Sequence, residues 1–248
     1  MKAFAGLRRG EASPPDPAGD GTRRRRAWRG ALALAVVAAV TAGLLWWHPW
    51  TPAVSGPKPM KFTTAAGGSP RFGTGEQLLR YKVRAEDGLK ESPGQFAAEV
   101  DAVLGNRHGW TADGTRSFQR MPADPVDFTV YLATPETTDR ICGQYGLDTG
   151  GWVNCGVGHQ VVINVKRWKE LTEFYTGQPE LYHALAVNHE VGHVLGLGHV
   201  DCPGPGQPAP VMMQQIKGLH GCVPNGWPYS DTGTLLTGPP IQAATPAP

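Results

Sequence analysis

Several features that would identify common functional classes are missing from this sequence of 248 residues. Its net charge is only +2, so it lacks the excess of basic residues that is typical of a nucleic-acid-binding domain, and we expect no nucleic-acid partner. It has four cysteines but no C-x-x-C motif, which argues against a cysteine-ligated zinc finger. Glycine and proline are abundant, at 33 and 23 residues, which predicts long irregular segments.

The N-terminal part combines a basic tail with an apolar run. Residues 1–29 are polar, rich in proline and glycine, and end in a cluster of arginines, so we predict a disordered cytoplasmic tail. Residues 30–47 are apolar over a length that just suffices for a transmembrane helix, and tryptophans occur at its far end. By the positive-inside rule, the chain would cross the cell membrane once and place the remainder on the extracytoplasmic side.

Two alternatives to this uncleaved anchor remain open. The apolar run could be a signal peptide that is cleaved near residues 53–55, which would give a secreted protein. The paired arginines also raise export through the twin-arginine route. The run is long and rich in tryptophan for a signal peptide, which favours the anchor. No cysteine lies near the run, so a lipid-anchored lipoprotein is excluded.

Composition divides the rest of the chain into three parts. Residues 48–74 are rich in proline, glycine, serine and threonine, and we predict that they form a linker between membrane and domain. Residues 75–238 contain the segments with regular hydrophobic periodicity and are expected to fold as one domain. Residues 239–248 are predicted to be a disordered tail.

Hydrophobic periodicity predicts three strands and two helices in this domain. Apolar residues alternate with polar ones over residues 79–85, 127–133 and 160–165, which is typical of strands with one buried face. Ser92 and Gln95 have the spacing of a capping box, and a helix is expected to follow and to end near Gly105.

The second predicted helix, which begins near Pro179, carries the most informative motif of the chain. Residues 189–199 read H-E-x-x-H-x-x-G-x-x-H, and on a helix His189 and His193 lie one turn apart on the same face. Both imidazoles could bind one Zn²⁺, and a turn at the glycine would bring His199 to the same ion. Three protein ligands leave one position open, as in catalytic zinc sites, and Glu190 is the candidate general base.

This motif resembles that of the metzincins, a clan of zinc endopeptidases. The resemblance implies an α+β fold with a small mixed sheet, an active-site helix and an irregular C-terminal subdomain, here behind a single N-terminal transmembrane helix. It also implies zinc as cofactor and a peptide or protein as substrate. Metzincins place an edge strand just before the zinc helix, so residues 160–165 are expected to be that strand and to pair with an extended substrate.

A methionine turn below the zinc site is a further feature that the resemblance implies. Met212 follows a hydrophobic residue some positions after the third histidine, as in that turn, and Met213 is the other candidate. Ordinary packing of a methionine pair in the core is the alternative interpretation.

Some metzincins have a tyrosine two residues after the methionine of this turn, where its hydroxyl can stabilise an oxyanion. This sequence has Gln214 or Gln215 there. Tyr229 and His220 are candidate substitutes, although surface or core roles are more common for such residues. The oxyanion-stabilising side chain is therefore not identified.

The chain from the zinc helix to Tyr229 also resembles an actinobacterial family of membrane-anchored metallopeptidases that is known only as a domain of unknown function. Members share a basic N-terminus, a membrane segment and an extracytoplasmic domain. This resemblance implies no particular substrate.

The four cysteines favour two disulfide bonds, because their number is even and the domain is expected to be exported. Spacing favours Cys142–Cys155, which would close a glycine-rich segment, and Cys202–Cys222, which would bracket the methionine turn. This is one of three pairings that four cysteines allow.

The function that the sequence predicts is that of a membrane-anchored zinc endopeptidase facing the extracytoplasmic side. Two alternatives remain: a binding module whose zinc is structural or catalytically inactive, and a zinc hydrolase acting on non-peptide bonds of the cell wall. A structural zinc site normally has four protein ligands, and the motif supplies three together with a glutamate that such a site does not need. The sequence predicts no oligomeric state.

Overall fold

A mixed six-stranded sheet organises the part of the chain that the computed structural model describes, residues 59–241. The strand order is β1-β2-β4-β6-β5, and β3 also pairs with β2. The pairs β2–β3, β2–β4 and β4–β6 are parallel, whereas β1–β2 and β5–β6 are antiparallel. The elements in chain order are β1 (Phe62–Thr64), β2 (Gln77–Glu86), α2 (Pro93–Leu104), β3 (Arg116–Arg120), β4 (Phe128–Ala133), α3 (Pro135–Gly143), β5 (Cys155–Val157), β6 (Gln160–Asn164), α4 (Val165–Glu170), η1 (Glu173–Tyr175), α5 (Pro179–Val194) and η2 (Gln215–Lys217).

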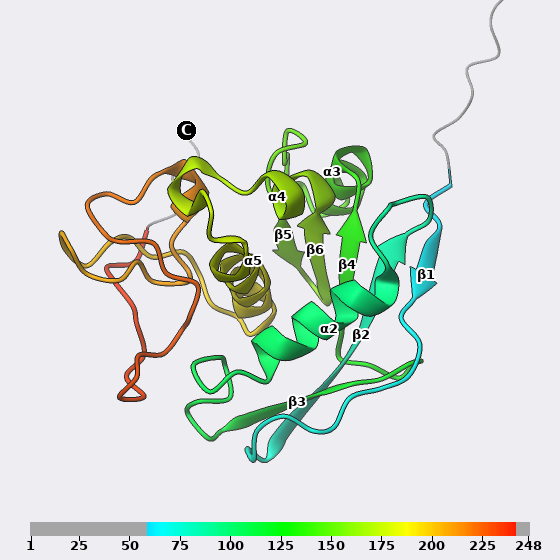
Figure 1. Cartoon of the computed structure of the whole chain (residues 1–248), viewed down its shortest axis with the longest axis horizontal. Coiled ribbons are helices and arrows are strands. Elements are labelled where there is room, and N and C mark those ends of the chain that lie inside the picture. The colour runs from blue at the N-terminus through cyan, green and yellow to red at the C-terminus, as the bar shows by residue number, and fades with distance from the viewer. Residues whose placement is uncertain (1–58, 242–248) are drawn as a thin grey trace, which may run out of the picture. The chain divides into compact units, whose positions relative to one another are not determined.

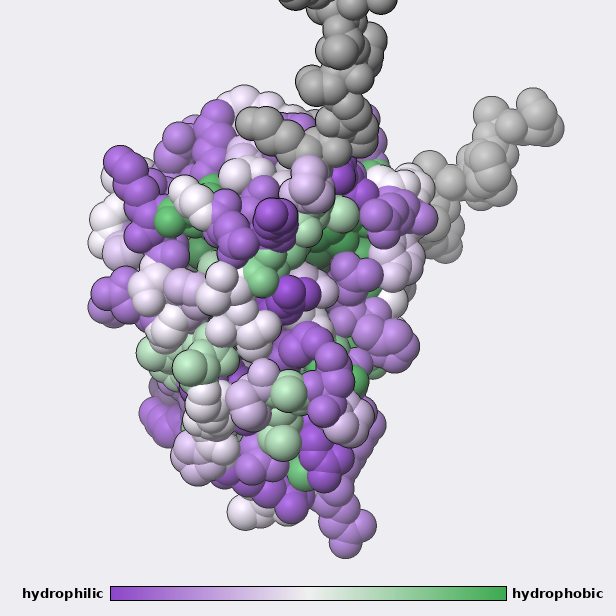
Figure 2. Space-filling view, turned by 90° about the vertical axis from the view of Figure 1, so that its right-hand side faces the viewer, coloured by the Kyte–Doolittle hydropathy of each residue, from purple (hydrophilic) through white to green (hydrophobic). Residues whose placement is uncertain are grey.

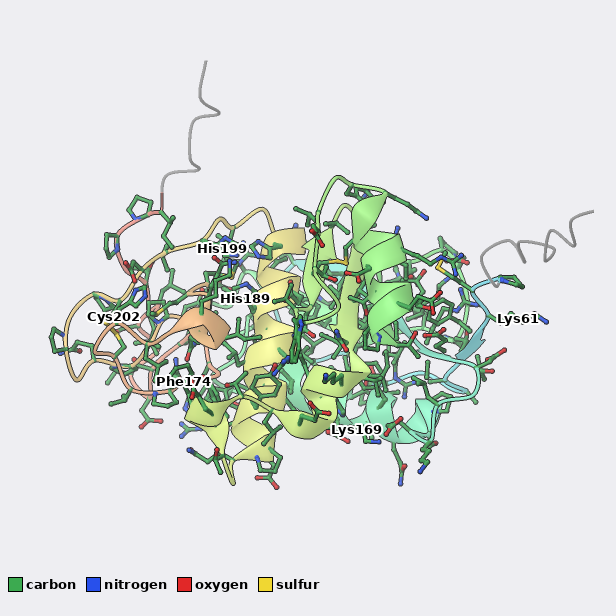
Figure 3. All side chains as sticks on the ribbon, turned by 90° about the horizontal axis from the view of Figure 1, so that it is seen from above. Lys61, Lys169, Phe174, His189, His199 and Cys202 are labelled. Atoms are coloured by element: carbon green, nitrogen blue, oxygen red, sulfur yellow. A yellow bond between two sulfur atoms is a disulfide. The ribbon has the colours of Figure 1, made fainter. Side chains whose placement is uncertain are left out.

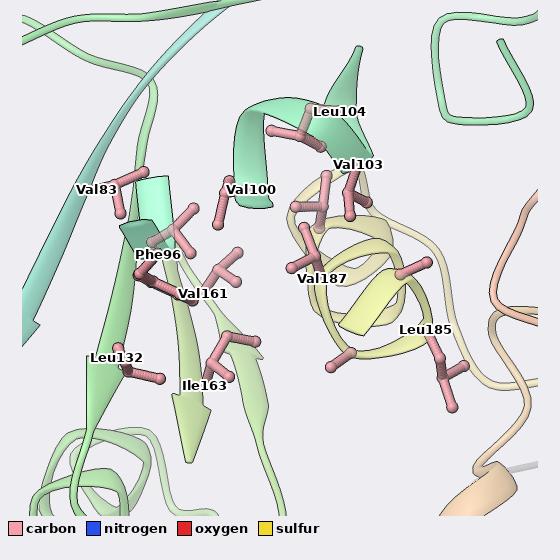
Figure 4. Close-up of a cluster of buried hydrophobic side chains, with 14 of the residues drawn as sticks. Val83, Phe96, Val100, Val103, Leu104, Leu132, Val161, Ile163, Leu185 and Val187 are labelled. Atoms are coloured by element: carbon pink, nitrogen blue, oxygen red, sulfur yellow. The ribbon is translucent and has the colours of Figure 1, made fainter. Parts of the chain in front are cut away.

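The inner strand β6 is buried on both of its faces, to which its successive side chains point in turn. In β6, Val161 and Ile163 belong to the main hydrophobic cluster, which α2 and α5 also form. Val162 points the other way, into a smaller cluster with Ile141 of α3 and the Cys142–Cys155 pair. Figure 4 shows side chains of the sheet, α2 and α5 meeting in the main cluster. The predicted α+β class with a small mixed sheet is confirmed.

Helix α5 lies between the sheet with α2 on one side and the irregular C-terminal chain on the other (Figure 1). It begins at Pro179, as predicted, because proline suits the first helical turn, where its missing N–H needs no partner. Nine of its residues are buried, and they occur on nearly every side of the helix. On one side the indole Nε1 of Trp110 donates to the Asn188 carbonyl oxygen at 2.9 Å, and on the other Asn188 Nδ2 donates to the Gly226 carbonyl oxygen at 2.9 Å.

The strands and helices expected from periodicity are present, with small differences at their ends. Tyr81, Val83 and Ala85 of β2 are buried and alternate with less buried basic residues, as predicted. Helix α2 ends at Leu104, with Gly105 as its C-cap, also as predicted. The predicted capping box does not form, because the Ser92 side chain, although at the N-cap, makes no capping hydrogen bond. Periodicity did not predict the short elements β1, β3, β5, α3 and α4.

The prediction that residues 160–165 form the edge strand is wrong. Strand β6 occupies Gln160–Asn164 and lies between β4 and β5, so both of its edges are paired. The edge strand is β5, only three residues long, which runs antiparallel to β6 after a tight turn at residues 158–159. A proline in β6 would therefore disturb the sheet itself rather than the binding of a substrate.

The folded domain extends beyond both of its predicted boundaries. Strand β1 lies within the segment predicted as linker, residues 48–74, and pairs with β2 through the register Phe62 to Glu86. At the other end, residues 239–241 fall in the predicted disordered tail, yet the Asp201 amide donates to the Pro239 carbonyl oxygen at 2.8 Å. The Ile241 amide donates to the His199 carbonyl oxygen at 3.1 Å. Both segments are therefore part of the fold.

The C-terminal part after α5 is irregular, as predicted, and disulfide bonds fix its loops. Cys202–Cys222 ties the chain that follows the third histidine to the chain after the methionine pair. Cys142–Cys155 joins the end of α3 to the start of β5. The predicted pairing is confirmed, and no cysteine among the described residues is free.

Helices of the described residues are all too short or too polar to cross a membrane. The predicted basic tail, residues 1–29, and the predicted transmembrane helix, residues 30–47, lie outside the part of the chain that the structure describes. On the face of the domain shown in Figure 2, hydrophobic residues are scattered among hydrophilic ones rather than gathered in one large patch.

The extended N-terminal boundary leads to a prediction about truncation. A fragment of residues 67–248 should be about 3 kcal/mol less stable than a fragment of residues 59–248. The shorter fragment loses the edge contact between the rings of Phe62 and Tyr131, whose centroids are 5.0 Å apart. It also loses the hydrogen bond from the Ala65 amide to the Val83 carbonyl oxygen. Urea unfolding followed by circular dichroism measures both values, and equal stabilities would restore the predicted linker.

Candidate metal centre

Three histidines converge at the C-terminal end of α5. His189 and His193 lie one turn apart on the helix, and His199 comes from the chain that follows it. The Nε2 atom of His193 is 3.2 Å from Nε2 of His189 and 3.1 Å from Nε2 of His199. Figure 3 shows His189 and His199 next to each other at this end of the helix. Among the described residues, this is the one group of three or more histidine, cysteine, aspartate or glutamate side chains close enough to hold a metal ion.

The glycine of the motif allows the chain to turn back after α5. Gly196 has a φ of 86°, in a region that residues with a side chain rarely adopt. The Leu197 amide donates to the Gly192 carbonyl oxygen at 2.9 Å and so closes the turn. This reversal brings His199 to the two helical histidines, as the motif predicted.

Hydrogen bonds to main-chain oxygens fix how two of the imidazoles are protonated. Nδ1 of His189 lies 2.7 Å from the Val211 carbonyl oxygen, and Nδ1 of His193 lies 2.9 Å from the Leu197 carbonyl oxygen. A carbonyl oxygen only accepts, so each Nδ1 carries a proton, and in the neutral ring Nε2 then presents a lone pair. Two lone pairs facing each other at 3.2 Å repel unless a cation lies between them.

The surroundings of the three rings favour their neutral form. Burial lowers the pKa of His189 to about 3, and the neighbouring His193 contributes in the same direction. Burial, with a contribution from His193, lowers the pKa of His199 to about 4, and burial also lowers the pKa of His193. Neutral imidazoles are the form that binds metal ions.

Glu190 is buried beside this cluster, with only 6 % of its surface exposed. The pKa of its carboxyl group is raised to about 8. Burial causes the rise, and a hydrogen bond from the Gly156 backbone opposes it in part. A cation held by the three histidines would bring this pKa down from its raised value, because positive charge favours the carboxylate. A carboxyl group with a pKa near neutrality is suited to accept and return a proton.

A cleft of about 450 Å³ contains the histidine cluster and Glu190. Helix α5 forms its floor with Tyr182, Leu185 and Ala186. Residues 147–149 and 153–156 form one wall, and residues 213–217 form the opposite wall. The edge strand β5 therefore borders the cleft, and an extended chain lying in it could pair with this strand.

The two candidate methionines of the turn contact the site in different ways. The carbonyl group that orients His189 belongs to Val211, the residue just before the pair. The Met212 sulfur lies against Gly192 of α5, so closely that no side chain would fit at that position without movement. Met213 lines the cleft and packs against Ala209 and the Cys202–Cys222 bond.

Neither candidate for an oxyanion-stabilising residue lines the cleft. Tyr229 is buried against Trp110, with its hydroxyl donating to Asp113 at 3.1 Å. His220 is exposed and pairs with Asp201 at 2.6 Å. Tyr229 therefore has the core role, and His220 the surface role, that the sequence analysis named as more common for such residues.

The two glutamines after the methionine pair do belong to the cleft. Gln215 is almost fully buried, and its Oε1 accepts from the Tyr175 hydroxyl and the Asn225 amide. Its Nε2 donates to the carbonyl oxygens of Pro210, at 3.2 Å, and Asn225, at 2.7 Å. With these partners Gln215 holds the cleft wall and has no group left for a ligand.

Sequence reasoning missed three residues of the site. Tyr182 lines the floor, and burial raises the pKa of its hydroxyl to about 12. Asn154 lines the wall, and its side-chain oxygen accepts from the Asn164 amide at 2.9 Å. Gly156 lies against the Glu190 main chain. Tyr182 could have been found, because it precedes His189 by two helical turns and so shares its face.

Comparison with known proteins identifies a family but no activity. A family model described as "Protein of unknown function (DUF3152)" matches residues 52–229, which include the three histidines and every residue that lines the cleft. Comparisons with curated proteins and with solved structures give no match.

The close contact at Gly156 leads to a prediction about stability. A Cβ at this position would overlap the Glu190 carbonyl oxygen and lie 2.9 Å from Cβ of His193. Gly156→Ala should therefore push β5 away from α5 and lower the free energy of unfolding by about 2 kcal/mol. Gly143→Ala is the matched control, since nothing lies within 4 Å of a Cβ there, and it should change stability by less than about 0.5 kcal/mol. Similar losses in both variants, measured by urea unfolding, would show that β5 can adjust.

Proposed function

The chain belongs to the DUF3152 family, and we propose that it is a zinc-dependent endopeptidase that hydrolyses peptide bonds in the cleft along α5. The observation that carries this proposal is the convergence of the three Nε2 atoms, two of which present lone pairs to the same point. Such an arrangement is unfavourable without a cation and favourable with one.

The donor set fits zinc in number, type and spacing. Zinc binds histidine nitrogen at about 2.0–2.1 Å in tetrahedral geometry, which places neighbouring nitrogens about 3.3 Å apart. The observed separations are 3.2 and 3.1 Å. Three neutral imidazoles leave one of the four positions to a non-protein ligand, as is typical of catalytic rather than structural sites. The carbonyl oxygens of Val211 and Leu197 would hold two of the ligand rings in orientation.

When bound, zinc would supply Lewis acidity, which lowers the pKa of water and polarises a carbonyl group. Glu190 would accept the proton of the attacking water and return it to the leaving amine. Burial of Glu190 and its hydrogen bond from Gly156 would keep this carboxyl group in place beside the water whose proton it would accept. The substrate would lie extended between the two cleft walls and pair with β5, not with β6.

An exported, membrane-anchored enzyme is part of this proposal. Both disulfide bonds support an oxidising environment, because such bonds are rare in the cytosol. The expected transmembrane helix at residues 30–47 would place the domain on the extracytoplasmic side.

The metal site can be tested by removal of one ligand. The purified chain should contain about one zinc ion, and a chelator should lower its melting temperature, since loss of a ligand that binds only the folded state removes stability. His193→Ala should lose both the zinc and the effect of the chelator. His159→Ala is a suitable control, because His159 is exposed and does not line the cleft. Wild-type protein that binds no zinc at micromolar concentration would refute the metal site.

A second prediction separates an enzyme from a binding module. Glu190→Ala should keep the zinc content and the fold, because Glu190 is not in the cluster of metal ligands. It should lower turnover of a cleaved peptide by about 10²–10⁴-fold, the usual contribution of a general base. Glu180→Ala, in the first turn of the same helix, is the control and should retain activity. Zinc-loaded wild-type protein that cleaves nothing in a diverse peptide library would favour the binding module.

A further inference from the structure

Exposed hydrophobic side chains gather in one loop beside the cleft. Seven large hydrophobic residues are exposed in the described part of the chain, and three of them, Tyr145, Leu147 and Trp152, fall within residues 144–154. We call this segment, between α3 and β5, the cleft loop. Single exposed hydrophobic residues are ordinary, but a group in one short segment indicates a contact surface.

The cleft loop is held firmly, so the exposure of these side chains is a property of the fold. The Cys142–Cys155 bond joins the residues that flank it. The Asp139 carboxylate accepts from the Thr149 hydroxyl and, at 3.0 Å, from the Gly151 amide. The Asn164 side chain donates to the Gly151 carbonyl oxygen at 3.0 Å. A surface ordered in advance loses little conformational entropy when it binds.

Two cations fix Trp152, the most exposed of the three hydrophobic side chains of the loop. Lys166 Nζ lies 4.1 Å and Arg167 Cζ lies 4.5 Å from the centre of the Trp152 ring, which is 53 % exposed. Arg167 Nε also donates to the Trp152 carbonyl oxygen at 2.7 Å. The indole is therefore oriented by cation–π contacts while much of its surface remains open to a partner.

The loop is continuous with the cleft. Leu147, with its neighbours Asp148 and Thr149, lines the cleft wall. Tyr145 stands at the other end of β5 from Trp152, since its hydroxyl accepts from Gln160 Nε2 at 3.0 Å next to the β5–β6 turn. The exposed side chains thus follow the edge strand, where an extended chain that leaves the cleft would meet them.

The charges around this surface favour an acidic partner. Lys166 and Arg167 lie at the loop, and Lys217 lines the opposite wall of the cleft. Within residues 59–241, no carboxylate forms an ion pair with any of these three cations. The acidic residues that line the cleft are Asp148 and the buried Glu190. Unpaired cations beside apolar side chains would attract a stretch that carries both acidic and apolar residues.

We propose that the cleft loop is a docking site for an acidic, apolar stretch of the polypeptide substrate, outside the residues next to the scissile bond. This rests on the proposed function, because that function makes the cleft the place where the substrate lies. Trp152 and Leu147 supply the apolar contacts, and Lys166 supplies the charge. The enzyme would accordingly prefer long, unfolded, acidic polypeptides to short peptides with the same cleavage site.

Binding can be measured apart from catalysis in the full-length chain with Glu190→Ala. The probes are casein, an acidic unfolded protein, and histone H1, a basic one. Casein should bind more tightly than histone H1, and Trp152→Ala should weaken casein binding about tenfold, a typical effect of an aromatic contact at the centre of an interface. Lys166→Glu should also weaken casein binding, and the loss should be larger at low salt than at high salt. Leu147→Ser provides a second apolar variant should Trp152→Ala fold poorly.

Leu235→Ala is the matched control, because Leu235 is 43 % exposed but lies far along the chain from the cleft loop. It should leave casein binding unchanged. If the loop variants bind casein as tightly as this control does, or if histone H1 binds better than casein, the docking site is wrong. Vesicles that contain phosphatidylglycerol test the other occupant: loss of vesicle binding in the loop variants with unchanged casein binding would overturn the proposal in favour of a membrane contact.

Hydrolysis by the chain with Glu190 intact separates this proposal from the proposed function. Trp152→Ala should raise KM for casein about tenfold without changing kcat, and should leave KM for a hexapeptide cut from the same site unchanged. An equal effect on casein and hexapeptide would refute docking outside the scissile region while leaving the peptidase intact. Binding of casein that depends on the loop, without any hydrolysis, would instead refute the peptidase and leave the binding surface.

Discussion

The hydrogen bond from His189 Nδ1 to the Val211 carbonyl oxygen, 2.7 Å long, joins the two halves of the candidate site. On one side is α5, whose position is fixed by burial between the sheet and the C-terminal chain. On the other is an irregular segment that has no sheet of its own to hold it. The Cys202–Cys222 bond and the hydrogen bonds of buried Gln215 restrain that segment instead. The orientation of a helical side chain therefore depends on the covalent and polar restraints of a loop.

Local sequence signals predicted the parts of the site that are local in the chain. The spacing of His189, His193 and His199 with one glycine specifies a helix, a turn and a shared point in space, all within eleven residues. Pro179 marks the first turn of α5, because the N–H that proline lacks would have no partner within the helix there. The disulfide pairing was accessible because each bond closes a short loop. These features needed no knowledge of what packs against the helix.

What the sequence could not provide is the place of each strand in the sheet. Strand β5 is three residues long, too short for any periodicity, and glycine at its centre has no side chain to indicate a buried face. The stronger pattern of β6 suggested an edge strand, but its successive valines pack on both faces of the sheet, as interior strands do. Similarly, β1 lies among prolines and glycines that indicate a linker, and only its pairing with β2 reveals it. Helix α3, in contrast, has a start that can be recognised in the sequence, with Thr134 at the N-cap and Pro135 in the first turn. It was missed because a glycine-rich segment follows directly.

Gly156 shows why the edge strand must carry glycine at this point. Its backbone hydrogen-bonds to Glu190, and its Cα lies so near the Glu190 main chain that a side chain would separate the strand from the helix. The same residue lines the cleft beside Cys155, whose bond to Cys142 closes the cleft loop. One small segment thus connects the candidate base, the edge available to an extended chain and the loop with exposed aromatic residues. A displacement of β5 would therefore change all three together, because the Glu190 carboxylate, the strand edge and the cleft loop all depend on the position of this segment.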